Sequence, residues 1–246
     1  MPAPIKYVAE PQHVHEVSLL GTADLELWRS RLEPEGLVPT AREGRAQILI
    51  IAADMRFMGV RFQELSVSVL TEQIAGMPSA GAFLLQAFNS CRLFAYVERR
   101  IFGTPYDTGE VTVATDCPAQ VELKQRNECL LRVQMDKAMP RTPCSSQEDG
   151  WSGPVFLPSQ RRGRNRGSRY FFAKVSGHTR TYPFSSDDVL TIRPGPGSDS
   201  LQHLLDSNFT MHEWMIRDDA IHGKSKTFKY SAPHPSTLPL VSPPNL

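Results

Sequence analysis

The sequence has few lysines and no paired cysteines. Of its 246 residues, 27 are basic, and only seven of these are Lys. A Cys-X-X-Cys pair is absent, so neither a zinc site nor a disulfide framework is indicated. The cysteines are Cys91, Cys117, Cys129 and Cys144.

Long apolar runs are also missing. No segment approaches the roughly 18 consecutive apolar residues of a membrane-spanning helix. The N-terminus, which begins Met1-Pro2-Ala3-Pro4, lacks the charged start and apolar stretch of a signal peptide. We therefore expect a cytoplasmic protein that does not contact a membrane.

The charge is almost balanced, with a formal net value of +1. Such a chain has no global field to hold a polyanion, so nucleic-acid binding is not expected. One exception is local, because five arginines lie between Gln160 and Arg169. This run contains no aromatic residue for base stacking and is interpreted as a solvated loop between two strands. The alternative, RNA binding by Arg161–Arg169, predicts a steep salt dependence.

With 40% hydrophobic residues, the chain can bury a core, and its length fits one domain rich in β-structure. We expect a single domain over residues 1–246, with a core at about 13–230. The segments 1–12 and 232–246 contain several prolines and are interpreted as extended arms.

Most of the predicted elements are strands. A short helix is indicated by the spacing of Leu25, Trp28 and Leu32, with Thr22 or Asp24 as its cap. Strand-like runs at 110–115, 120–124 and 128–135 have the spacing of an antiparallel meander. The segment from Pro140 to Gly153 is polar and is predicted as a loop. These features indicate an α+β, mainly antiparallel and barrel-like domain.

The run from Val60 to Val69 carries an interruption in its alternation. Val60 and Phe62 are in one phase, whereas Leu65, Val67 and Val69 are in the other. The change of phase at Gln63-Glu64 predicts a bulge or bend in the strand.

Most familiar chemical motifs are absent. The sequence contains no HExxH, GxSxG, Walker or GxGxxG pattern. No metal and no organic cofactor is therefore expected. His13 and His15 alternate on a predicted N-terminal strand, without the spacing of a ligand set.

One set of residues, with its spacing, resembles the pattern of the acetoacetate decarboxylase superfamily. Phe62-Gln63-Glu64 is similar to the family's aromatic, any, Glu element, and Arg99 precedes Pro105 at the family's spacing. The separation of 42 positions between Glu64 and Tyr106 is also close to that in the family. The resemblance covers about residues 13–230. It implies a mainly antiparallel barrel or cone with a few short helices, and a homo-oligomer.

The family's amine is missing. Tyr106 occupies the position of the lysine that forms the Schiff base in the family, and Asp107 that of the second lysine. A phenol forms no imine, so the resemblance does not extend to amine-based decarboxylation. Lys124 and Lys174, in strand-like runs, are the alternatives for a relocated amine.

Three further lysines, Lys224, Lys226 and Lys229, are interpreted as solvated charges. The family's N-terminal arginine also has no match, and His13 and His15 lie in that stretch.

The remaining groups predict acid/base chemistry. Glu64 is the candidate general acid or base, Tyr106 the donor to a substrate oxyanion, and Arg99 the cation for a substrate carboxylate. Phe62, His13 and His15 complete the predicted substrate-binding set. Each has a structural alternative: Glu64 in a salt bridge, Arg99 as a surface charge, Tyr106 as turn packing.

The sequence thus predicts a lyase or isomerase that acts on a keto acid or polyketide-like acid. Enolisation, dehydration, cyclisation or decarboxylation would proceed without a Schiff base. The alternative is a non-catalytic protein that binds a small molecule on the same fold.

Overall fold

The computed structural model describes residues 4–137, 141–159 and 168–230. Most of these residues lie in strands. The strands are β1 (Tyr7–Ala9), β2 (Val14–Asp24), β3 (Ala41–Arg42), β4 (Arg45–Phe57), β5 (Val60–Thr71), β6 (Gly81–Asn89), β7 (Tyr106–Thr108), β8 (Glu110–Ala114), β9 (Gln120–Gln125), β10 (Glu128–Gln134), β11 (Ser145–Leu157), β12 (Ser168–Pro183), β13 (Val189–Ile192) and β14 (Thr210–Tyr230).

The helices are short. They are α1 (Leu25–Leu32), α2 (Arg92–Val97) and α3 (Asp199–Asp206), with a 3-10 turn η1 (Glu33–Glu35) and a π-helical turn η2 (Glu98–Phe102). Asp24, one of the two caps that the sequence predicts, accepts a hydrogen bond from the backbone of Leu27 at 2.8 Å at the start of α1. Gly36, with a φ of 68°, ends η1 in the left-handed region that glycine tolerates.

The large sheet closes on itself. Its strands follow the order β14-β12-β11-β6-β5-β4-β2, and β14 also pairs with β2. Neighbours in this ring are antiparallel except for β11 and β6. β1 adds to β14, β3 to β4, and β7 to β6. The predicted fold class, mainly antiparallel β with a few short helices, is confirmed.

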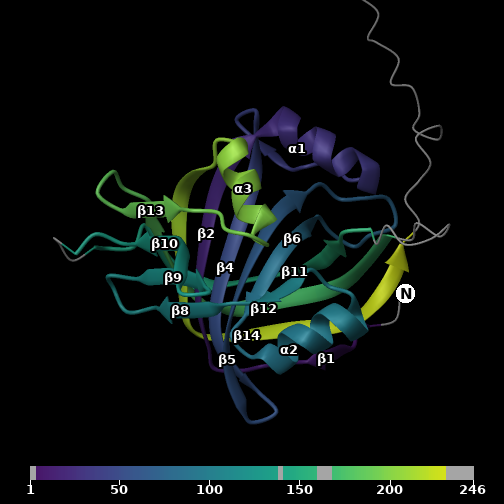
Figure 1. The fold of residues 1–246 in the computed structure, drawn as a ribbon, viewed down its shortest axis with the longest axis horizontal. Helices are drawn as coiled ribbons and strands as arrows, with labels where there is room; N and C mark the ends of the chain where they lie inside the picture. The colour runs from purple at the N-terminus through teal and green to yellow at the C-terminus, as the bar shows by residue number, and fades with distance from the viewer. Residues whose placement is uncertain (1–3, 138–140, 160–167, 231–246) are drawn as a thin grey trace, which may run out of the picture.

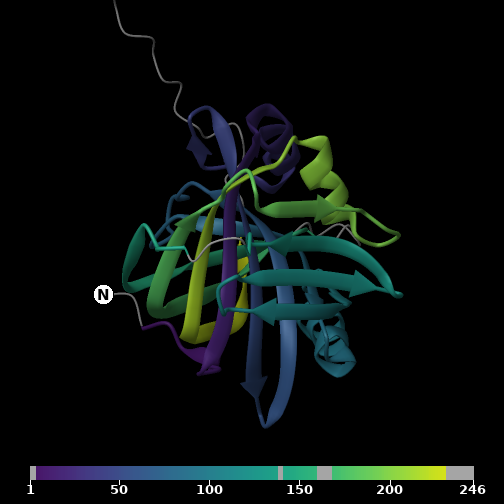
Figure 2. The ribbon, with the colours of Figure 1, turned by 90° about the vertical axis from the view of Figure 1, so that its left-hand side faces the viewer.

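A second sheet, β13-β10-β9-β8, packs against the outside of the ring. In Figure 2 its strands cross in front of the long strands of the ring. The main core lies between the two sheets and extends under α1 and α3, with the fully buried Trp28 and Trp214 as its largest members. Figures 1 and 2 both place α1 and α3 at one end of the ring and α2 at the other.

The opposite face of the large sheet lines the inside of the ring. Lys224, from β14, lies 4.7 Å from the ring centroid of Phe171 and 5.5 Å from that of Tyr106. The strands β12 and β11 separate β14 from the β6–β7 pair in the sheet. Lys224 therefore reaches Tyr106 across the inside of the ring.

The predicted bulge at Gln63-Glu64 is wrong. Both residues keep an unbroken register with β4, where they pair with Asp54 and Ala53. The irregularity in β5 lies instead between Val67 and Ser68, in its pairing with β6. The change of phase has another cause, because both faces of β5 are covered. Leu65, Val67 and Val69 enter the main core, whereas Phe62 belongs to a separate apolar cluster inside the ring.

The predicted polar loop is shorter than expected. β11 already begins at Ser145, and its exposed first half pairs with the second half of β12. Backbone pairing needs no apolar side chains, which is why composition alone missed this part of the strand. Most of the arginine-rich run, residues 160–167, lies outside the described residues. Arg169 is described, and it donates hydrogen bonds to the carbonyl oxygens of Phe102 and Gly103.

In the part of the chain that the structure describes, no helix has the length and apolar character needed to cross a membrane.

Candidate functional site

A row of polar side chains crosses five neighbouring strands inside the ring. The register pairs Arg217 with Glu16, Glu16 with Ala53, Ala53 with Glu64, and Glu64 with Asn89. These residues come from β14, β2, β4, β5 and β6. Because adjacent strands lie about 4.8 Å apart, the Cα atoms of Glu16 and Glu64 are separated by about 10 Å. The small Ala53 lies between them.

Glu64 is held by two neutral donors. The Tyr106 hydroxyl donates to Glu64 Oε1 at 2.8 Å, and Asn89 Nδ2 donates to Oε2 at 3.1 Å. Tyr106 itself is buried and packs with Leu84, Ala87 and other apolar residues. Glu64 and Tyr106, which the sequence predicts as the acid/base pair, are therefore in direct contact.

Burial shifts the pKa values of both Glu64 and Tyr106. It raises the pKa of Glu64 above the usual range, although the charge of Lys224 and the hydrogen bonds from Tyr106 and Asn89 act in the opposite direction. Burial and the charges of Glu64 and Glu98 raise the pKa of Tyr106 well above its usual value. Tyr106 therefore remains a hydroxyl donor, and Glu64 has an increased affinity for a proton.

Lys224 supplies a cation to the same site. Its Nζ lies 2.5 Å and 2.6 Å from the two carboxylate oxygens of Glu98. The ring of Phe102 joins those of Phe171 and Tyr106 around the ammonium, an arrangement typical of cation–π contacts.

The π-helical turn η2 positions Glu98. Gly103, with a φ of 62°, ends this turn in the left-handed region and leads the chain toward β7. The hydroxyl of Thr104 donates to Glu98 Oε2 at 2.8 Å. Arg169 fixes the turn by donating to the backbone of Phe102 and Gly103. Single π-helical turns are frequent at functional sites.

A second cluster lies in the same row. Glu16 is fully buried and accepts hydrogen bonds from Ser18 at 2.6 Å and Arg217 at 2.5 Å, while its other oxygen lies 2.5 Å from His222 Nε2. Burial opposes ionisation of Glu16, yet His222, Arg217 and Ser18 together lower its pKa to about 2. Glu16 is therefore an ionised carboxylate, and its pKa is shifted in the direction opposite to that of Glu64.

The other predicted site residues lie elsewhere. Arg99 is largely exposed and pairs with Asp107 at 3.0 Å. Asp107 follows Tyr106 in β7, so its side chain points to the opposite face, and Arg99 follows it away from Glu64. His13 is exposed beside Asp219, and His15 is also exposed.

Phe62 lies on the same strand face as Glu64, two residues away. It makes an edge-to-face contact with Phe94 of α2, with ring centroids 4.9 Å apart. It therefore packs α2 against the inside of the ring.

The sequence-based interpretation of the lysines is corrected by the structure. Lys124 lies in the small sheet and pairs with Glu122 at 2.8 Å. Lys174 lies on the outside of β12, over the ring of Tyr7 and beside Glu10. Lys224, predicted to be solvated, faces the inside of the ring. His222 and Lys224 alternate along β14, and this alternation is the sequence signal that was available for them.

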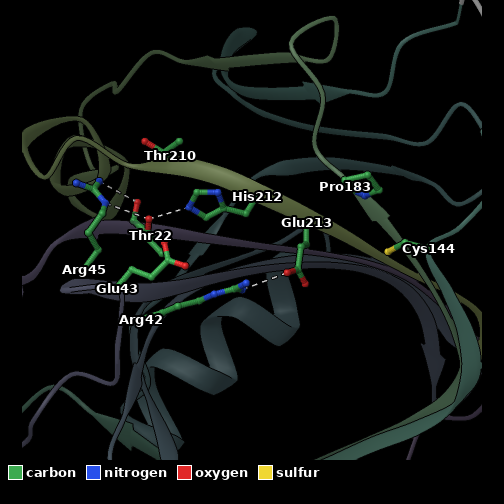
Figure 3. A pocket seen from close by; sticks show the side chains of 9 residues that line it. All are labelled: Thr22, Arg42, Glu43, Arg45, Cys144, Pro183, Thr210, His212 and Glu213. Atoms are coloured by element: carbon green, nitrogen blue, oxygen red, sulfur yellow. Dashed lines mark hydrogen bonds and ion pairs between the residues drawn. The ribbon is translucent and has the colours of Figure 1, made fainter.

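A separate groove of about 530 Å³ opens at another part of the molecule (Figure 3). In it, Arg42 pairs with Glu213, and Arg45 donates a hydrogen bond to the hydroxyl of Thr22. Thr22 follows Glu16 by six residues on β2, so the groove lies about 20 Å from the polar row. The lining residues are Thr22, Arg42, Glu43, Arg45, Cys144, Pro183, Thr210, His212 and Glu213.

Comparison with solved structures identifies the architecture. An acetoacetate decarboxylase from Legionella pneumophila subsp. pneumophila str. Philadelphia 1 superposes with a TM-score of 0.65 and 14% identity, over 94% of this chain and 92% of the other. The chain has the acetoacetate decarboxylase fold. The resemblance inferred from the sequence is confirmed at the level of the fold.

Two further structures agree. One, from structural studies of acetoacetate decarboxylase, has a TM-score of 0.60 and 12% identity, covering 93% of this chain and 90% of the other. The other is an acetoacetate decarboxylase-like enzyme from Sphingomonas wittichii RW1, with a TM-score of 0.55, 12% identity and coverages of 92% and 94%. No protein-family model matches the sequence, and no curated protein matches it significantly.

Proposed function

We propose that this protein is a lyase or isomerase that acts on a keto acid or polyketide-like acid by acid/base chemistry. The observation that supports this most directly is the contact between the buried Tyr106 and the partly buried Glu64, whose pKa values are both raised. Perturbed titratable groups in contact are typical of catalytic sites.

The chemistry follows from the two groups. When the substrate binds, the Tyr106 hydroxyl exchanges its hydrogen bond to Glu64 for one to the carbonyl oxygen of the substrate. The Glu64 carboxylate removes a proton from the adjacent carbon, and the electron pair of the C–H bond moves to form the enolate, whose oxygen Tyr106 stabilises. The proton on Glu64 then returns to another carbon or to a leaving hydroxyl, which completes an isomerisation or a dehydration. A raised pKa suits Glu64 to both steps.

An imine is not part of this proposal. Attack on a carbonyl needs an amine with a free electron pair. The Nζ of Lys224 is engaged by both oxygens of Glu98. Lys124 and Lys174 point away from Glu64.

The test is proton exchange at the carbon next to a carbonyl. The protein is incubated with 2-oxohexanoate in D2O, and deuterium incorporation is followed by NMR. The wild type should catalyse exchange, Glu64→Gln should abolish it, and Tyr106→Phe should slow it by about 100-fold. Glu26→Gln is the matched control, since Glu26 is exposed on α1 and pairs with Arg29.

Two results would contradict the proposal. One is exchange that persists in Glu64→Gln while circular dichroism shows an intact fold. The other is a lysine adduct after borohydride treatment with the same keto acid, read by intact mass, because it would show that the reaction uses an amine. Saturable binding with no exchange in the wild type would favour a non-catalytic binding protein on this fold.

A further inference from the structure

Lys224 has a hydrogen-bonding capacity that its partner does not use. An ammonium group has three N–H donors, and a carboxylate that faces it takes at most two. Among the described residues, Nζ of Lys224 has hydrogen bonds to Glu98 alone. The remaining contacts of the ammonium are with aromatic rings. One N–H is therefore available to a ligand.

Solvent reaches the side chains of this ion pair. The side chains of Lys224 and Glu98 are 22% and 18% exposed, and Glu64 also keeps some solvent contact. Arg217, the other cation of the polar row, is only 5% exposed and is engaged by Glu16. Of these two cations, Lys224 is the one that a small molecule can contact without rearrangement of a buried ion pair.

The position of Lys224 matches the chemistry of the acid/base pair. Its ammonium lies 5.5 Å from the ring centroid of Tyr106, and its charge acts on Glu64. A keto acid whose carbonyl oxygen accepts from Tyr106 would have its carboxylate within reach of such a cation. The Arg99 side chain, which the sequence predicted for this task, pairs with Asp107 instead.

We propose that Lys224 binds the carboxylate of the substrate through the N–H that Glu98 leaves free, and so makes the site specific for acids. This inference rests on the proposed function for the identity of the site. Glu98 then affects the binding of the carboxylate in two opposite ways. It orients the ammonium, with Thr104 fixing its own position, and its negative charge also repels the incoming carboxylate.

The experiment compares an acid with its uncharged analogue. Dissociation constants of 2-oxohexanoate and its methyl ester are measured by calorimetry near neutral pH. The wild type should prefer the acid by about tenfold or more, as expected for one charge-assisted hydrogen bond. Lys224→Met should abolish the preference, and Lys224→Arg should restore part of it. Glu98→Gln should strengthen the preference, because the competing charge is removed.

Lys226→Met is the matched control. Lys226 lies on the same strand, is exposed, and rests over the ring of Phe228. This variant should bind both compounds as the wild type does. Thermal unfolding of each variant shows whether it is folded.

Three results would overturn the inference: no preference for the acid in the wild type, a preference that survives in folded Lys224→Met, or a Glu98→Gln variant that favours the ester. Binding is read separately from deuterium exchange. Acid preference that depends on Lys224, without exchange that depends on Glu64, would refute the proposed reaction and keep the carboxylate site. Exchange that depends on Glu64, without an acid preference that depends on Lys224, would refute the carboxylate site and keep the proposed reaction.

Discussion

The substitution Glu16→Gln tests the buried half of the polar row. Glu16 is fully buried, and it is the principal partner of Arg217, which is 5% exposed. Gln keeps the shape of the side chain but leaves the guanidinium with only one carboxylate partner, the more distant Asp149, 3.6 Å away. Removing one partner of a buried ion pair costs about 3–5 kcal/mol. We expect the free energy of unfolding at pH 7 to fall by this amount.

The lowered pKa of Glu16 gives a second value for this loss of free energy of unfolding. Its partners lower the pKa from 4.5 to about 2, and a difference of this size corresponds to about 3 kcal/mol. Because the folded-state pKa is depressed, the stabilisation is complete above pH 4.5 and is lost as the pH falls toward 2. Between pH 7 and pH 3, the advantage of the wild type over Glu16→Gln should therefore shrink by about 2 kcal/mol.

Urea unfolding of both proteins at pH 7 and pH 3 measures this difference. Carboxylates far from Glu16 titrate equally in the two proteins, so the comparison reports on Glu16 together with the groups that contact it, Arg217 and His222. In the control Glu26→Gln, the exposed pair with Arg29 should contribute less than about 0.5 kcal/mol at either pH. A difference for Glu16→Gln that stays constant with pH would refute the assignment of Glu16 as an ionised group inside the ring.

Two further predictions concern the site and its surroundings. Tyr106→Phe should raise the pKa of Glu64 further, because the hydrogen bond from the hydroxyl lowers it; carbon-13 NMR of the labelled carboxyl follows this, and an unchanged titration would contradict the geometry. Arg99→Gln should change the free energy of unfolding by less than about 0.5 kcal/mol and leave deuterium exchange and acid binding as in the wild type, because Arg99 pairs with Asp107 on the outside; a loss of acid binding would show that Arg99 contacts the substrate.

Local signals were sufficient for part of the fold. The cap at Asp24 and the spacing of Leu25, Trp28 and Leu32 are short-range features, and α1 forms where they predict it. The meander of the small sheet was predictable for the same reason, since its strands follow one another along the chain. β14 was not predicted, because its polar second half is a strand only through its pairing with β12 and β1.

The site was predictable only where a resemblance supplied long-range information. Glu64 and Tyr106 were identified as a pair from their similarity to a family pattern. Glu98 and Lys224 are separated by 126 residues, and nothing local to either indicates the other. Their contact depends on the closure of the ring, which brings β14 across from η2. Sequence patterns of one strand at a time do not contain this information.

The electrostatic difference between Glu16 and Glu64 connects the fold to the proposed chemistry. Both carboxylates project from one row of the same sheet, and burial disfavours ionisation of both. Glu16 contacts Arg217 and His222 directly, so its pKa falls, whereas the hydrogen bonds of Glu64 come from the neutral Tyr106 and Asn89.

Lys224 acts on Glu64 only through space, because its ammonium is held by Glu98. The effect of burial therefore exceeds that of the cation, and the pKa of Glu64 rises. When the environment shifts the pKa values of two neighbouring carboxylates in opposite directions, the group with the raised pKa is the one suited to proton transfer. This difference supports the proposal that Glu64 exchanges a proton with the substrate, whereas Glu16 has an ion-pairing role.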